Sequence, residues 1–280
     1  DHQKSHYMTI LKRYSILVID SGVGGLSICR SILSRQGDIQ IVYLADDAYS
    51  PYGLMSEAAL SERLQHIVST MLQDHRVDLV VLACNTVSTL LLPELRARFE
   101  VPFVGVVPAI KPAAITSKSK AIGLLATPAT VKRAYIDQLI LDHANGCQVV
   151  RVGSSELVIE AEKKLAGEAL NAEVLAQVVS PFIDSNDELL VDTIVLGCTH
   201  FPFLREDLGR IAPGVEWVDS GDAIASRVSD LLSNMPSRAL SGDTAKHRVY
   251  FSKTLPETER ASLVLNELGL HEHQLLQFKA

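Results

Sequence analysis

The sequence has no long hydrophobic run. Nowhere in its 280 residues do about 18 apolar residues follow one another, the length that a membrane-spanning helix needs. The first thirteen residues, DHQKSHYMTILKR, lack the apolar stretch and the cleavage site of a secretory signal. We therefore expect a cytoplasmic protein with no membrane partner.

Basic clusters are missing as well. The chain carries 26 Lys and Arg against 33 Asp and Glu, a net charge of −7, and no run of basic residues that could follow a phosphate backbone. Nucleic acid is therefore not an expected partner. Hydrophobic residues make up 47% of the chain, enough to fill the core of one large domain or two ordinary ones.

The motifs that hold cofactors and metals are also lacking. The turn Gly22-x-Gly24-Gly25 is not the dinucleotide fingerprint, because its third glycine comes too early. No lysine lies in a context that suggests a Schiff base. The four cysteines form no CxxC pair, which argues against a disulfide framework and a zinc site; they are Cys29, Cys84, Cys147 and Cys198. We expect no cofactor and no metal.

One short sequence occurs twice. Residues 80–86 read VVLACNT and residues 194–200 read IVLGCTH. Each apolar run is typical of a strand buried on both faces of a parallel sheet. Ligands of open α/β sheets bind at the carboxyl ends of the strands, so Cys84 and Cys198 are expected at the edge of a binding crevice. A buried cysteine is otherwise an inert small hydrophobe, the interpretation that fits Cys29 and Cys147.

The surrounding segments repeat too. The strand 15–20 followed by the turn SGVGG corresponds to residues 121–127 followed by PATV, at a similar distance from the next cysteine. Such a duplicated βα unit predicts an α/β fold with two pseudo-symmetric halves, each a mostly parallel sheet flanked by helices. The active site is then expected in the cleft between them. Among the helices, one is expected over 87–98 and another over 129–144, closed by Asn145-Gly146.

Two thiols on opposite sides of a small cleft suit the inversion of a stereogenic carbon. One thiolate removes a proton and the other thiol returns one to the opposite face, with Asp20 and His200 as proton carriers beside the two cysteines. A one-base or nucleophilic enzyme needs only one cysteine. An amino acid would be held by the polar side chains of Ser21, Asn85, Thr86, Thr127 and Thr199, and Tyr52 and Gly53 could close over it.

Several separated motifs resemble those of the glutamate racemases, in the family of cofactor-independent aspartate and glutamate racemases. They are DSGVGGLSI, YSPYG, LACNT, GVVPAIKPA, LLATPATV and LGCTHFPFL, spread from about Ile16 to beyond Asp219. The resemblance implies interconversion of L- and D-glutamate, which supplies D-glutamate for peptidoglycan. It also implies two α/β domains, 14–107 with 222–280 and 108–221, after a polar tail of residues 1–13.

The resemblance also implies roles for single residues. Cys84 would act as the base on D-glutamate, assisted by Asp20, and Cys198 as the base on L-glutamate, assisted by His200. The family glutamate falls on Glu162, with Glu160 as the alternative. The pairs that match the family's substrate-binding positions are Asp20-Ser21, Tyr52-Gly53, Asn85-Thr86 and Thr199-His200.

Partners and alternatives follow from the same resemblance. The sequence is similar to the enterobacterial type, which implies activation by UDP-N-acetylmuramoyl-L-alanine, and a homodimer is compatible with it. An aspartate racemase uses the same two-thiol logic on a related fold. A two-lobed protein that only binds a small acidic ligand is the alternative from outside the enzymes.

Overall fold

A six-stranded parallel sheet forms the first half of the protein. The computed structural model describes residues 14–144, 146–183, 190–236, 240, 246–253, 258–271 and 273–276. The strand order is β10-β9-β2-β1-β3-β4, and all of the pairs are parallel. The strands are β1 (Tyr14–Asp20), β2 (Ile39–Ala45), β3 (Leu79–Leu82), β4 (Phe103–Gly105), β9 (Arg248–Phe251) and β10 (His273–Leu275).

A second, four-stranded parallel sheet has the order β6-β5-β7-β8. Its strands are β5 (Ala121–Ala126), β6 (Gln148–Gly153), β7 (Thr193–Leu196) and β8 (Glu216–Val218). This order repeats β2-β1-β3-β4 of the first sheet, so β3 and β7, the strands before the two cysteines, occupy equivalent places. The predicted α/β fold with two similar parallel sheets is confirmed. We call the parts built on the first and second sheets the first and second lobes.

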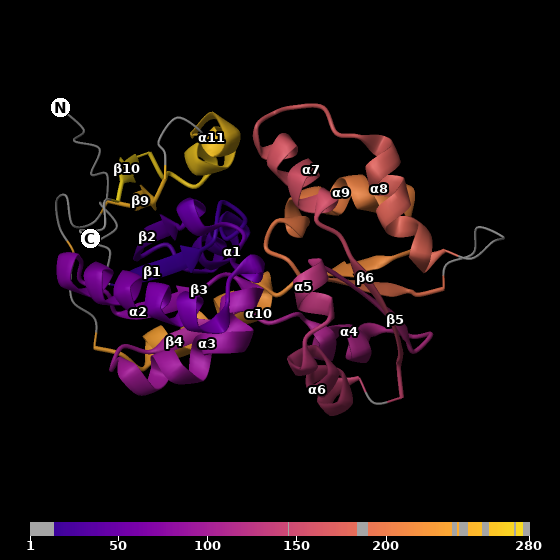
Figure 1. Ribbon diagram of the computed structural model, residues 1–280, viewed down its shortest axis with the longest axis horizontal. Helices are drawn as coiled ribbons and strands as arrows, with labels where there is room; N and C mark the ends of the chain where they lie inside the picture. Colours follow the sequence, from indigo (N-terminus) through magenta and orange to yellow (C-terminus); the bar gives the residue numbers. More distant parts are fainter. Residues whose placement is uncertain are drawn as a thin grey trace, which may run out of the picture.

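Helices cover both faces of each sheet (Figure 1). Along β1, Ile16 and Val18 pack into one apolar cluster and Leu17 and Ile19 into the other, since side chains alternate across a strand. The first lobe has α1 (Leu26–Arg35), α2 (Glu57–Asp74), α3 (Asn85–Arg98), α10 (Gly221–Ser233) and α11 (Thr258–Glu267). The second has α4 (Ile110–Thr116), α5 (Pro128–Val131), α6 (Ala134–His143), α7 (Glu156–Leu165), α8 (Ala172–Val179) and α9 (Arg205–Ile211).

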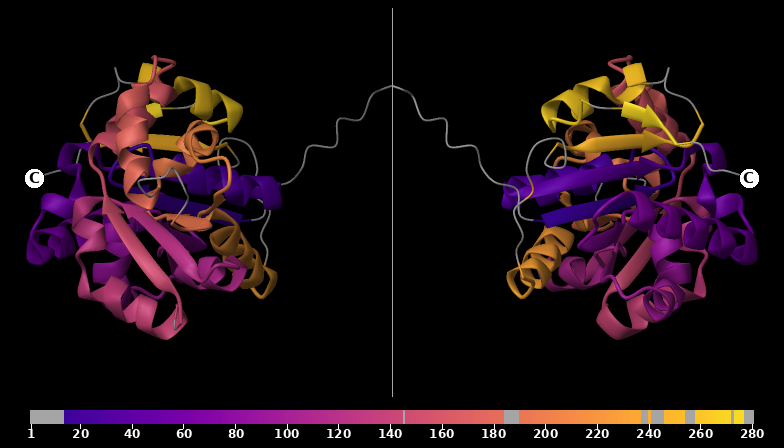
Figure 2. Two further views of the ribbon diagram at one scale, coloured as in Figure 1. Left: turned by 90° about the vertical axis from the view of Figure 1, so that its right-hand side faces the viewer. Right: turned by 90° about the vertical axis from the view of Figure 1, so that its left-hand side faces the viewer.

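Two strands late in the sequence extend the sheet that the first strands form. Figure 2 shows β9 and β10 next to the strands at the start of the chain, and β9 pairs with β2. Helix α10 contributes Ile224, Ala225 and Val228 to the cluster beneath α1. The exact domain boundaries at 107/108 and 221/222 stay a prediction. None of the helices among the described residues combines the length and the apolar character that crossing a membrane requires.

Two predicted helices differ from the observed ones. The helix expected over 129–144 is divided into α5 and α6, because the backbone of Arg133 is extended (φ −77°, ψ 138°); the apolar pattern continues across the break and gives no sign of it. Residue 145 of the predicted cap lies outside the described residues. The helix expected from residue 87 begins at Asn85, directly after Cys84.

Two elements were not predicted, namely α4 and β10. A proline, Pro112, is the third residue of α4. The first turn of a helix has no intrahelical partners for its N–H groups, so proline costs no hydrogen bond there. Strand β10 is only three residues long, too short for an alternating pattern to be recognised.

Candidate active site

A cavity of about 400 Å³ lies between the lobes, a suitable size for a small ligand. Its wall includes every residue that the sequence predicted for the site except the alternative glutamate Glu160: Asp20, Ser21, Tyr52, Gly53, Cys84, Asn85, Thr86, Thr127, Glu162, Cys198, Thr199 and His200. They follow the carboxyl ends of β1, β2, β3, β5 and β7 or lie on α7. Ser50, Pro51 and Ile159 also line the cavity and were not predicted.

Cys84 and Asp20 form the side of the cavity that belongs to the first lobe. Asp20 is almost completely buried, and its Oδ2 accepts a 2.7 Å hydrogen bond from the Gly25 N–H. Burial raises the pKa of Asp20, although His200 and the backbone N–H groups act in the opposite direction. Burial, together with the charge of Asp20, raises the pKa of the Cys84 thiol to about 12. A raised pKa favours the protonated thiol, which is the form of Cys84 that can donate a proton.

Cys198 has different surroundings. Its Sγ lies 3.9 Å from Nδ1 of His200. Nε2 of His200 is 3.4 Å from Oε1 of Glu162, an ion-pair distance without hydrogen-bond geometry. Burial alone would lower the pKa of His200, but Cys198, Glu162 and Asp20 together raise that pKa to about 10. The two thiols therefore have different electrostatic surroundings, since an imidazole that favours its protonated form lies beside Cys198 and the carboxyl group of Asp20 lies on the side of Cys84.

The choice between the two glutamates of α7 is decided by where they point. Glu162 lines the cavity. Glu160 is buried on another side of the helix, where its Oε1 is 2.7 Å from Nζ of Lys163 and its Oε2 accepts from the Asn171 N–H at 2.7 Å. Successive helical residues are rotated by about 100°, so residues two apart face different directions. Of the two glutamates, Glu162 is therefore the one that lines the cavity.

The turn that carries Cys198 belongs to the second lobe but rests on the first. The Ser27 hydroxyl, on α1, donates a 2.7 Å hydrogen bond to the Thr199 carbonyl. A Cβ on Gly24 would overlap Nδ1 of His200 and come within 2.6 Å of Oγ1 of Thr199. Neither Gly24 nor Ser27 was predicted as a contact of this turn, because the sequence shows no relation between residues so far apart.

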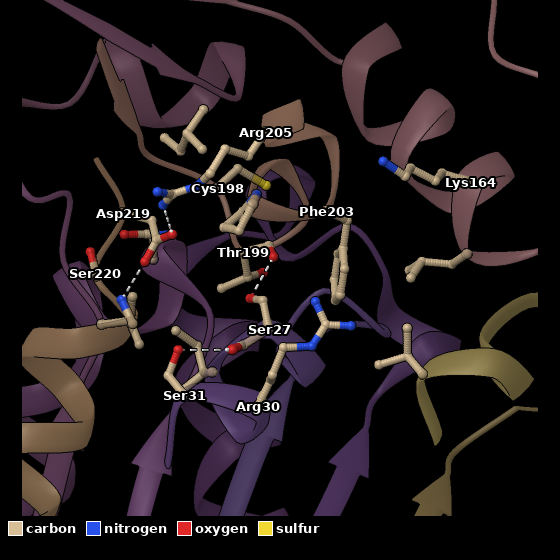
Figure 3. Close-up of a pocket in the computed structure, with 18 of the residues that line it drawn as sticks. Ser27, Arg30, Ser31, Lys164, Cys198, Thr199, Phe203, Arg205, Asp219 and Ser220 are labelled. Atoms are coloured by element: carbon tan, nitrogen blue, oxygen red, sulfur yellow. Dashed lines mark hydrogen bonds and ion pairs between the residues drawn. The ribbon is translucent and has the colours of Figure 1, made fainter. Parts of the chain in front are cut away.

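A second cavity, of about 500 Å³, lies behind the same turn (Figure 3). It shares Asn85, Cys198 and Thr199 with the first cavity. Three cationic side chains line it, Arg30, Lys164 and Arg205, each paired with a carboxylate: Glu267, Asp207 and Asp219 respectively. A molecule in this cavity would touch the back of the turn that positions Cys198.

Within the described residues, no group of three or more His, Cys, Asp or Glu is placed to hold a metal ion. All four cysteines are free thiols. The cavity wall itself offers side chains that can carry protons and polar groups that can hold a small zwitterion.

Comparison with known proteins gives consistent results. The family model described as Asp/Glu/hydantoin racemase matches residues 16–228. A glutamate racemase of Vibrio cholerae is 44% identical over 260 residues, which cover 92% of this chain and 95% of that protein. A glutamate racemase of Shewanella oneidensis is 49% identical over 220 residues, covering 78% and 79% of the two chains.

A solved structure is also similar over nearly the whole chain. The crystal structure of Escherichia coli glutamate racemase, in complex with L-glutamate and the activator UDP-MurNAc-Ala, superposes with a TM-score of 0.88 at 42% identity. The match covers 94% of this chain and 98% of the other.

Proposed function

This chain belongs to the Asp/Glu/hydantoin racemase family, and we propose that it interconverts L- and D-glutamate without a cofactor. The resemblance predicted from the sequence is confirmed. One observation carries the proposal: Cys84 and Cys198 follow equivalent strands of two similar lobes and line one cavity. The reaction supplies D-glutamate for peptidoglycan.

In the proposed mechanism, the Cys198 thiolate takes the α-proton of L-glutamate and becomes a thiol. The Cys84 thiol then gives its proton to the opposite face of the α-carbon and becomes a thiolate, which completes the inversion to D-glutamate. The reverse reaction exchanges the two roles. His200, held by Glu162, stabilises charge at Cys198, and Asp20 holds or relays a proton beside Cys84.

Substrate binding is proposed to use the polar groups of the cavity wall. Among the described residues, Asn85 Oδ1 is a buried acceptor without a hydrogen-bond partner, which suits an ammonium group. Asn85 and Thr86 lie in the first turn of α3, where free N–H groups favour a carboxylate. Ser21, Tyr52-Gly53, Thr127 and Thr199-His200 provide the remaining contacts.

The direct test follows the optical activity of each enantiomer of glutamate and aspartate by circular dichroism, with purified protein and no added cofactor. We expect both glutamate enantiomers to reach the racemate and aspartate to remain unchanged. Turnover of aspartate in place of glutamate would make the protein an aspartate racemase. Binding of glutamate without any loss of optical activity would support the two-lobed binder and contradict the proposal.

Replacing Asp20 by asparagine should lower racemisation by roughly a hundredfold, the scale of losing a proton-transfer group, and should also change how the stability of the fold depends on pH. Because the folded pKa of Asp20 is raised, the folded state binds this proton more tightly than the unfolded state. Stability is therefore lost as the pH rises from about 4 through the raised pKa. Asparagine cannot ionise. The free energy of unfolding of Asp20→Asn, measured in urea, should therefore rise relative to that of wild type between pH 4 and pH 8. A difference in the free energy of unfolding between variant and wild type that does not change with pH would contradict this prediction.

Activation by UDP-N-acetylmuramoyl-L-alanine is proposed as well, supported by the E. coli relative, whose structure contains that activator. The second cavity is the candidate site, because its cationic side chains suit a diphosphate and its wall includes the Cys198 turn. The assay above is run with and without this compound. We place the reaction in the cytoplasm, where a reducing environment keeps cysteines such as these four as thiols. A homodimer stays a prediction.

A further inference from the structure

The loop after β2 reaches from the first lobe to the second. It contains two short 3₁₀ helices, η1 (Asp47–Tyr49) and η2 (Tyr52–Leu54), and residues 50–54 line the substrate cavity. A Cβ on Gly53 would lie 3.1 Å from the Cβ of Ala129 in the second lobe. A displacement of this loop would therefore change both the cavity wall and the contact between the lobes. We call residues 50–54 the cavity loop.

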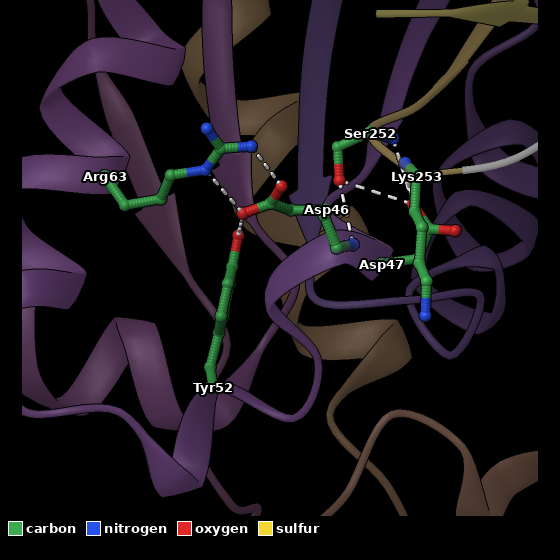
Figure 4. A network of polar contacts seen from close by, with 7 residues as sticks. Asp46, Asp47, Tyr52, Arg63, Ser252 and Lys253 are labelled. Atoms are coloured by element: carbon green, nitrogen blue, oxygen red, sulfur yellow. Dashed lines mark hydrogen bonds and ion pairs between the residues drawn. The ribbon is translucent and has the colours of Figure 1, made fainter. Parts of the chain in front are cut away.

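A buried carboxylate lies beneath the cavity loop (Figure 4). Asp46 has no exposed surface and does not line the cavity. Its Oδ2 accepts a 2.8 Å hydrogen bond from the Tyr52 hydroxyl. The Arg63 guanidinium, on α2, donates to both carboxylate oxygens, from Nε to Oδ2 at 3.0 Å and from Nη2 to Oδ1 at 2.6 Å. The carboxylate thus joins the loop to the helix behind it.

Charge and packing fix this arrangement further. Burying a carboxylate is costly unless it is paired and hydrogen-bonded, and the two-pronged contact with Arg63 meets both conditions. The same guanidinium lies 4.2 Å from the centre of the Tyr49 ring, a cation–π distance. Arg63 therefore holds the segment on both sides of Ser50 and Pro51, through Tyr49 and through Asp46 with Tyr52.

The start of the segment is tied to the catalytic strand and to the end of the chain. The Asp46 N–H donates a 2.9 Å hydrogen bond to the carbonyl of Asp20. The neighbouring Asp47 accepts from the backbone N–H groups of Ser252 and Lys253, both at 2.9 Å. Adjacent carboxylates thus have separate partners, and only Asp46 contacts the tyrosine of the cavity loop.

We propose that the Asp46–Arg63 ion pair is a positioning device, which holds Tyr52 and Gly53 in the place that substrate binding requires. This inference rests on the proposed function for the identity of the substrate. Neither residue lines the cavity, so both act through Tyr52. A loop that is already held in place has little conformational freedom left to lose when substrate binds, so binding costs less free energy.

The test compares Asp46→Asn, Arg63→Lys and Tyr52→Phe with the control Asp47→Asn, which removes the same charge one residue away. In the first two variants we expect KM for both enantiomers of glutamate to rise about tenfold with kcat within about twofold, since loosening the loop weakens ground-state and transition-state binding alike. Tyr52→Phe, which removes only the hydroxyl link, should raise KM about threefold. Asp47→Asn should match wild type. Mirror-image amino acids have equal free energies, so kcat/KM must fall equally in both directions.

Hydrogen exchange provides a readout that does not depend on activity. The amide of Leu54 is bonded to the Pro51 carbonyl and that of Met55 to the Tyr52 carbonyl, each at 3.1 Å. These amides should exchange faster in Asp46→Asn and Tyr52→Phe than in wild type and Asp47→Asn. Unchanged KM and unchanged exchange in folded Tyr52→Phe and Arg63→Lys would overturn the inference. If wild type does not act on glutamate, the proposed function fails, and the exchange result alone decides the positioning role.

Discussion

Cys198→Ser and Cys84→Ser should each lower racemisation of glutamate by at least about a thousandfold, the upper range for losing a group that transfers a proton in the transition state. A serine hydroxyl is a far weaker acid than a thiol, so it neither forms the anion that removes the α-proton nor releases its own proton readily. Optical rotation measures the inversion, and NMR in heavy water measures exchange of the α-hydrogen.

The two readouts together test the two-base assignment. Each variant keeps one working thiol, which faces the α-hydrogen of one enantiomer. For that enantiomer, exchange of the α-hydrogen should be faster than inversion. Cys147→Ser is the matched control, because this cysteine lies outside both cavities, and it should retain wild-type turnover. Wild-type racemisation by either Cys84→Ser or Cys198→Ser would remove that thiol from the mechanism.

Adding a single methyl group at Gly24 should have the next largest effect. A Cβ there would overlap His200 and come within 2.6 Å of Thr199, so the Cys198 turn and α1 would have to move apart. The hydrogen bond from Ser27 to the Thr199 carbonyl would be strained by the same movement. We expect Gly24→Ala to lower kcat/KM by about a hundredfold, since small displacements of catalytic groups cost about that much, and to lower the free energy of unfolding by about 1–3 kcal/mol.

Gly22→Ala is the control for this prediction, because a Cβ on Gly22 meets no atom within 4 Å. Both glycines lie in the same turn, so both variants lose backbone freedom. Only Gly24→Ala also creates an overlap with the second lobe, so comparing the two variants separates these effects. Denaturant unfolding and initial rates for both enantiomers provide the measurements. Equal behaviour of the two variants would mean that the turn adjusts to the added methyl and that the close approach does not position Cys198.

Much of the candidate site could be predicted because its residues directly follow buried strands. The apolar runs before Cys84 and Cys198 mark strands by their composition, and parallel strands bring their carboxyl ends to one edge. The duplicated pattern then indicated two similar halves. The family motifs added roles for Asp20 and His200, which remain to be tested by substitution. Glu162 was identified only together with its alternative Glu160, because this stretch departs from the commonest pattern of the family.

What escaped prediction depends on contacts between distant segments. Arg63 on α2 pairs with the carboxylate that follows β2, and Ser27 on α1 holds a carbonyl of the second lobe. Neither pairing leaves a periodic pattern or a local motif, since each side chain alone is an ordinary polar residue of a helix. The break between α5 and α6 is similar, because the apolar spacing runs on through it.

The sequence by itself determined the strands other than β10, the placement of the two thiols at strand ends and the family, since these depend on hydrophobic pattern and on short contiguous motifs. Only the tertiary structure decided which glutamate faces His200, how the Cys198 turn rests on Gly24 and Ser27, and that Asp46 lies beneath the cavity loop. The physical reason is that direction and proximity of side chains arise when helices and sheets pack, and packing joins residues that sequence order keeps apart.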